Sequence, residues 1–236
     1  MPEHTTPSDA AASELDDPSY RRGVVELLGV LAFGELSAFE RLAEDAKLAP
    51  TLRDKAHLAE MALVEMQHFV SLRDRLAELG LDPYDAMAPF EATFTRFHLQ
   101  TAPSDWLEGL VKAYVGDGLA ADFYREIAAF LDLETRTLVL EALADSGNSA
   151  FVVERVREAI ETDPKVAGRL ALWGRRLMGE ALSQAQVVAA EHDGLTAVLV
   201  GGADAPSGMD LASIGRMFTR LTENHAARMA ELGLDS

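Results

Sequence analysis

The segment ALVEMQHFVSL, residues 62–72, lies in a long stretch whose apolar residues recur with the 3.6-residue period of an α-helix. The apolar stripe of this helix runs from Leu58 to Leu72, and Glu65 and His68 lie on it. Because residues three apart share one helix face, both polar side chains are expected to face the core. A buried carboxylate must be paired, coordinate a metal or shift its pKa until it is neutral. The segment therefore predicts a helical core with a polar site inside it.

The composition predicts a globular, cytoplasmic protein. Of the 236 residues, 48% are hydrophobic, which is enough for one sizeable core, and no run of about 18 apolar residues predicts a membrane span. Residues 1–18 lack the basic and apolar parts of a secretory signal, so we expect a disordered tail there and one domain over 19–236. The absence of cysteine excludes disulfides and thiolate ligands, and a net charge of −18 disfavours binding to DNA.

The rest of the chain has the same helical character. Apolar periodicity and breaking residues predict an all-α fold with six helices, over 19–48, 51–79, 104–130, 134–161, 165–191 and 210–232. Short loops make the first four helices two antiparallel hairpins, joined by a long crossover over 80–103. The expected architecture is a four-helix bundle with two additional C-terminal helices.

A weak repeat relates the two hairpins. Gly34-Glu35 aligns with Gly116-Asp117, and further along Glu65 aligns with Asp145. Each of the four acids lies near the middle of an apolar stripe, so the four helices would bring four carboxylates into one core. Such carboxylates repel each other, and bound divalent metal would compensate their charge.

The motifs GELSAFERLA (34–43) and EMQH (65–68) resemble those of the ferritin-like di-iron carboxylate superfamily. The C-terminal sequence RMFTRLTENHAARMAELGL more narrowly resembles bacterial ferritin-like proteins similar to the tRNA 2-methylthio-isopentenyladenosine hydroxylase. The resemblance implies an iron site, dinuclear or mononuclear, or a manganese site, and dioxygen-dependent oxidation or hydroxylation. Its implied metal ligands are Glu35, Glu65, His68, Asp117 and Asp145.

The second half of the motif departs from that pattern, because Asn148 stands where a second His is expected. Three outcomes remain open: one metal on the first half-site, two metals with an oxygen-rich second position, or a polar core without metal. Glu180 and His225 lie on apolar stripes and are candidates for a missing ligand or for buried hydrogen bonds. Tyr114 and Tyr124 flank Asp117 and could bond to the site or only pack.

The functional alternatives are correspondingly two. The protein is a ferritin-like oxidase or hydroxylase, or it is a non-enzymatic helical scaffold with a degenerate metal site, for which a homodimer is one expected assembly. A tRNA substrate requires the scattered arginines to gather into one patch, because the overall charge is strongly acidic.

Overall fold

The computed structural model of the protein describes residues 15, 17–143, 149–200 and 211–235. Within these residues every regular element is a helix, which confirms the all-α prediction. The elements are α2 (Pro18–Asp45), η1 (Ala46–Leu48), α3 (Leu52–Glu78), α4 (Pro83–Met87), η2 (Ala88–Phe90), α5 (Glu91–Gln100), α6 (Trp106–Ala128), α7 (Leu133–Ala142), α8 (Ser149–Thr162), α9 (Lys165–Glu191), α10 (Asp193–Val200) and α11 (Leu211–Glu231).

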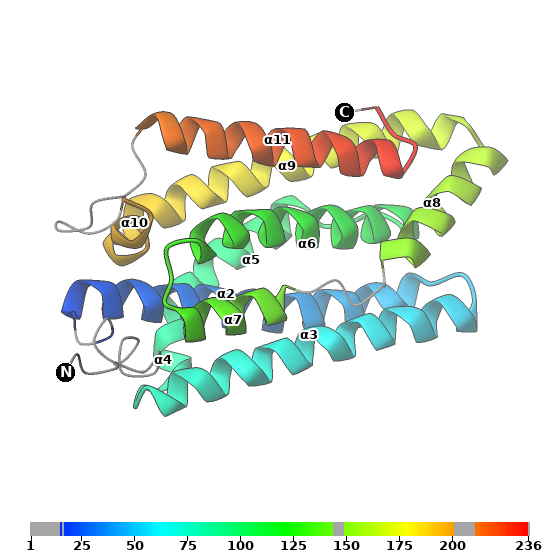
Figure 1. Ribbon diagram of the computed structural model, residues 1–236. Coiled ribbons are helices and arrows are strands. Elements are labelled where there is room, and N and C mark those ends of the chain that lie inside the picture. The colour runs from blue at the N-terminus through cyan, green and yellow to red at the C-terminus, as the bar shows by residue number, and fades with distance from the viewer. Residues whose placement is uncertain (1–14, 16, 144–148, 201–210, 236) are drawn as a thin grey trace, which may run out of the picture.

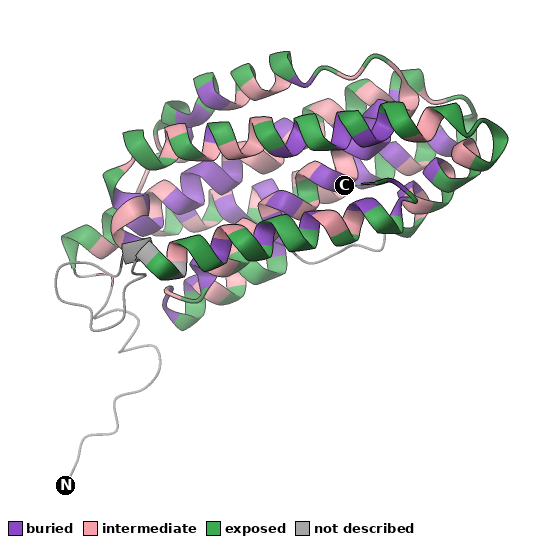
Figure 2. Ribbon diagram, turned by 90° about the horizontal axis from the view of Figure 1, so that it is seen from above, coloured by how far each residue is buried: buried purple, intermediate pink, exposed green. Residues whose placement is uncertain are grey.

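The long helices lie side by side along one direction, with α2 and α3 at one side, α6 in the middle and α9 and α11 at the other side (Figure 1). Their buried residues gather on the faces that point toward the neighbouring helices, while exposed residues cover the outside (Figure 2). The helix starts have clear local causes: the Asp17 side chain caps α2 ahead of Pro18, and Thr51 caps α3.

The structure adds to and corrects the expected helices. No helix was expected in the crossover over 80–103, but α4, η2 and α5 occupy most of it. The single helix expected over 134–161 is divided into α7 and α8, and residues 144–148 between them lie outside the described residues. A further short helix, α10, follows α9 and packs against α2. Of the expected N-terminal tail, residues 1–14 and 16 also lie outside the described part, and α2 already begins at Pro18.

The crossover packs closely on α2 because α2 has a glycine at the point where the two segments are in contact. A Cβ added at Gly29 would lie 2.3 Å from the backbone oxygen of Ala86 in α4. No side chain fits at that position, so the glycine sets how near α4 can come to α2.

Two apolar clusters form the core, and they follow one another along α2, α3 and α6. Leu42 and Leu58 belong to the first cluster, and Leu31 and Leu72 belong to the second. Helices α2, α3 and α6 run through both clusters. The stretches of α2 and α3 between the clusters contain the polar residues that the sequence singled out.

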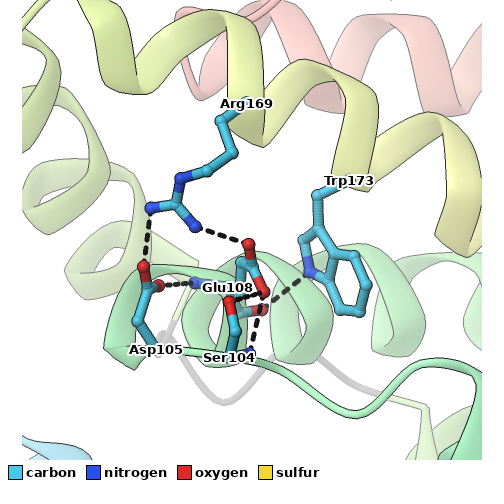
Figure 3. Close-up of polar contacts among 5 residues, drawn as sticks. All are labelled: Ser104, Asp105, Glu108, Arg169 and Trp173. Atoms are coloured by element: carbon cyan, nitrogen blue, oxygen red, sulfur yellow. Dashed lines mark hydrogen bonds and ion pairs between the residues drawn. The ribbon is translucent and has the colours of Figure 1, made fainter.

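Polar contacts fasten the start of α6 to α9 (Figure 3). Asp105 caps α6 by accepting from the Glu108 backbone N–H at 2.9 Å. Arg169 of α9 pairs with both acids, and its Nη2 lies 2.7 Å from Asp105 Oδ2. The indole of Trp173 donates to the Glu108 carbonyl at 2.9 Å. Although burial raises the pKa of the Glu108 carboxyl, hydrogen bonds from Ser104 and Arg169 bring it below its usual value.

Candidate metal centre

Glu35, Glu65 and His68 meet between α2 and α3, at the junction of the two apolar clusters. Glu65 and His68 share one face of α3 because they are three residues apart, and Glu35 faces them from α2. One potential ligand atom from each residue lies within 4.8 Å of the other two. The side chains of Glu35, Glu65 and His68 are only 11%, 16% and 21% exposed, so the group is largely removed from water. We call these three residues the triad.

The triad is compact around His68. Its Nδ1 lies 3.5 Å from Glu35 Oε2 and 4.0 Å from Glu65 Oε2. These separations are too long for hydrogen bonds, and this buried nitrogen has no hydrogen-bond partner among the described residues. Two carboxylate oxygens and an imidazole nitrogen at this spacing could surround a small cation.

Burial controls the protonation of the two acids. It raises the pKa of Glu35 to about 7 and that of Glu65 to about 9. A hydrogen bond between the two carboxyls raises the pKa of Glu65 further and lowers that of Glu35, so Glu65 is the one that holds the proton. The charge of Asp117 adds to the rise at Glu35. In the metal-free protein at neutral pH, the two carboxyls therefore keep at least one proton between them. This proton reduces the negative charge that a bound cation would otherwise neutralise.

These observations fit a bound metal. A buried nitrogen without a partner among the described residues and a carboxyl pair that retains a proton are properties expected of carboxylate and imidazole ligands that bind a cation. Carboxylate and imidazole ligands suit iron and manganese alike.

The other predicted ligands differ in their positions. Asp117 of α6 is exposed and lies outside the triad, although its charge reaches Glu35 and it lines the same cavity. Asp145, together with Asn148, lies outside the described residues. Glu180 and His225 neither join the triad nor line the cavity, within the part of the chain that the structure describes. His225 is buried instead on α11, where burial and Arg228 lower its pKa.

The two tyrosines that flank Asp117 have different surroundings. The hydroxyl of Tyr114 donates to Glu231 of α11, so this side chain ties α6 to α11. Tyr124 faces the triad's side of the cavity, where burial first, and the charge of Glu35 second, raise its pKa above the usual value. Its phenol therefore keeps its proton at physiological pH.

A cavity of about 320 Å³ extends from the triad along the bundle axis. On α2 it follows residues at helical spacing from Glu35 through Ala38 to Asp45, and on α6 it follows Gly116 and Asp117. Its walls are mostly apolar, with aromatic rings from the crossover helix α5. A Cβ placed on Gly116 would meet no atom within 4 Å, because this glycine faces open space. The volume is enough for roughly ten water molecules at about 30 Å³ each, or for a small organic molecule.

One end of the cavity contains basic and acidic side chains that were not predicted from the sequence to lie together. Arg41, Asp45, His98 and Lys112 line this part, which we call the charged end. His98 shows no ligand spacing and lies in the crossover, where no helix was expected. The helical period of α2, which puts Arg41 three residues after Ala38 and four before Asp45, was the available signal.

Comparisons with known proteins place the chain among proteins of this architecture. Residues 18–202 match a family described as the ferritin-like domain of actinomycetes. The chain is also similar to the 3-demethoxyubiquinol 3-hydroxylase of Verminephrobacter eiseniae (strain EF01-2). The two are 30% identical over 179 residues, which cover 71% of this chain and 76% of that protein. In the described residues, no helix is both long and apolar enough to cross a membrane.

Proposed function

Because the chain belongs to the family of ferritin-like domains of actinomycetes, we propose that the triad holds iron or manganese and that the protein uses dioxygen to oxidise a small, mainly apolar molecule. The observation that carries this proposal is the position of the triad, which combines metal-ligand chemistry with an opening onto an apolar cavity. Similarity to a hydroxylase favours hydroxylation as the reaction.

The metal, when bound, would supply dioxygen activation and one-electron chemistry that no side chain offers. The chain's own residues prepare the site for it. Glu35 and Glu65 would release their shared proton on metal binding and become carboxylate ligands, and His68 would offer a ring nitrogen. Asp117, whose charge reaches Glu35, would add a further carboxylate or accept a proton.

The cavity would hold the substrate next to the triad and keep water away from it. Apolar walls favour an apolar substrate by removing its surface from water. Tyr124 keeps its phenolic proton and so presents a hydrogen-bond donor at the same wall. These groups position the substrate carbon that is to be oxidised.

Elemental analysis tests the proposal directly. Protein expressed with iron and manganese supplements is expected to contain bound metal, which the Glu65→Ala/His68→Ala variant should lose while its helical circular dichroism persists. A matched control exists on the same helix: His57 and Glu60 are also three residues apart, with Nδ1 and Oε2 3.6 Å from each other, but their side chains are 43% and 72% exposed. The His57→Ala/Glu60→Ala variant should retain the metal.

The metal content also distinguishes a dinuclear site from a mononuclear one. About two metals per chain would support a dinuclear centre completed by Asp117 and Asp145, and about one would support the triad alone. A wild-type protein without metal, or a triad variant with unchanged metal, would refute the proposal. The alternative of a helical scaffold with a degenerate site, for which Asn148 is the sequence argument, would then replace it.

A tRNA substrate is less well supported than a small molecule. Several of the arginines that a basic patch would need are paired with acids instead: Arg73 with Asp74, and Arg220 with Glu126. Such pairs leave little positive charge for phosphates, whose binding depends on clustered cations. Salt-dependent binding of tRNA at low ionic strength would nevertheless restore that substrate.

A further inference from the structure

The charged end of the cavity is built from buried or half-buried polar groups on three elements. Lys112 of α6 is buried and donates from Nζ to the Thr101 carbonyl at 2.8 Å. His98 of α5 lies 2.7 Å, through Nε2, from the hydroxyl of Ser37 on α2. Arg41 of α2 completes the group near the surface, with its side chain 40% exposed. The helices thus bring basic side chains from far apart in the sequence to one end of an apolar cavity.

Hydrogen-bond accounting at this end leaves donors in excess. Arg41 Nε and His98 Nδ1 are buried and have no partner among the described residues. An ammonium group has three N–H donors, and only one from Lys112 reaches a described acceptor, the Thr101 carbonyl. If Ser37 donates to Nε2 of His98, then Nδ1 carries the hydrogen and is a donor as well. Buried donors without acceptors are costly, so an acceptor brought by a ligand would stabilise this end.

Burial sets the protonation states at this end. It lowers the pKa of His98 to about 3, so this imidazole is neutral, and it lowers the pKa of Lys112 to about 8, so the amine stays mainly protonated at pH 7. Among the described residues, Asp45 is the acid that lines this end of the cavity, and burial raises its own pKa. Glu44 pairs with Arg41 at 2.7 Å on the solvent side, where its side chain is 54% exposed. The formal charges of Arg41 and Lys112 are therefore balanced by Glu44 and Asp45, and the need for an acceptor comes from the donors that lack partners.

The distance between this end and the triad suits one ligand that reaches both. Arg41 follows Glu35 by six residues, a rise of about 9 Å along α2. The walls between them are apolar, and Gly116 and Ala38 keep that stretch open. A chain of about eight to ten carbons would span it.

We propose that the charged end is a carboxylate-binding site, and that the ligand of this cavity is an aliphatic carboxylate whose head lies among Arg41, His98 and Lys112 and whose chain runs toward the triad. That this ligand is the substrate rests on the proposed function. That it binds in the cavity does not. The orientation of the ligand determines which carbon would be oxidised: one near the end of the chain rather than beside the carboxylate. Asp45 would limit affinity, because its charge opposes that of the ligand.

Binding to metal-free protein tests this site independently of any metal or turnover. By isothermal titration calorimetry at pH 7, decanoate is expected to bind at least tenfold more tightly than decanol, since only decanoate carries the anionic head. The Lys112→Met variant should lose that preference while its affinity for decanol is unchanged. The Asp45→Asn variant should bind decanoate several-fold more tightly, which a merely damaged protein would not do.

A second test of the same site fills the middle of the cavity with a larger side chain. Gly116→Leu should weaken decanoate binding at least tenfold, because the new side chain occupies the path between head and triad. Gly179→Leu is its matched control, since Gly179 is another helical glycine with no neighbour within 4 Å but lies outside the cavity lining. Equal affinities for decanoate and decanol in the wild type would overturn the inference, and so would unchanged decanoate binding in Gly116→Leu. A protein that binds decanoate but no metal would refute the proposed function and leave this site standing.

Discussion

Replacing Glu65 by Gln in the metal-free protein is expected to remove most of the pH dependence of stability between about pH 6.5 and pH 8. Glu65 is buried beside a second carboxyl, and its pKa rises from 4.5 to about 9 on folding. In this pH range the folded protein therefore binds a proton that the unfolded chain has released. Stability falls as pH rises wherever the folded state binds more protons, so the wild type should weaken steadily across the range.

The size of the effect follows from the shift. One bound proton changes the free energy of unfolding by about 1.4 kcal/mol per pH unit, which gives about 2 kcal/mol over the range from Glu65 alone. For a domain of this size that corresponds to a fall in Tm of about 4–8 °C. Glu35, with a pKa of about 7, adds to the slope only in the lower part of the range. His98 titrates below the range, and Lys112, at about 8, reaches only its upper limit.

The assay is urea unfolding followed by circular dichroism, with a chelator present, at several pH values. Glu65→Gln cannot hold this proton and should lose most of the slope, with a remainder from Glu35 in the lower part of the range. It should also be more stable than the wild type at pH 8. Glu78→Gln is the control, because Glu78 is on the same helix but 68% exposed and paired with Arg75. Parallel slopes for the wild type and Glu65→Gln would mean that the acid pair is not protonated, and the account of the metal-free triad would be wrong.

Further outcomes follow from other contacts. Arg169→Met should lower the free energy of unfolding by about 1–2 kcal/mol at neutral pH, because Glu108 is left buried without its cation. This loss should shrink as acid protonates Glu108. Urea unfolding at pH 7 and pH 4 measures both effects. Gly29→Ala should destabilise the protein by about 2 kcal/mol or more, since its Cβ would meet the Ala86 carbonyl at 2.3 Å. Gly116→Ala should stabilise it by about 0.5–1 kcal/mol, because the methyl group enters open space and a helical glycine is removed; thermal unfolding of the two glycine variants should shift in opposite directions, and a shared direction would contradict the contact analysis.

Much of the fold was predictable from the sequence because long helices carry strong periodic signals. The boundaries expected for α3 and α9 agree with the structure to within a residue, since capping residues and breakers mark them. The ferritin-like assignment made from GELSAFERLA and EMQH is confirmed by the family match. The meeting of Glu35 with Glu65 and His68 was also foreseeable, because hydrophobic periodicity placed each of them on a buried stripe.

The rest depended on tertiary packing that periodicity does not encode. Short helices such as α4 and α10 have too few turns for a clear pattern, so neither of them was expected. The charged end could not be found in the sequence, since it arises only when α5 brings His98 against Ser37 of α2. The complete ligand set stays a prediction, because Asp145 lies outside the described residues and Asp117 remains apart from the triad.

The division of the core into two clusters has a consequence for how the molecule opens. Isolated helices fray from their ends, so their amides usually exchange most slowly in the middle. Here α2 and α3 pass from one apolar cluster to the other through a polar, hollow midsection. Hydrogen exchange in the metal-free protein should therefore be faster around Glu35 and Glu65 than in the parts of α2 and α3 that lie in the apolar clusters, such as those around Leu28 and Leu58. Small molecules would then reach the cavity through local opening of α2 and α3 near the triad, and no separate lid would be needed.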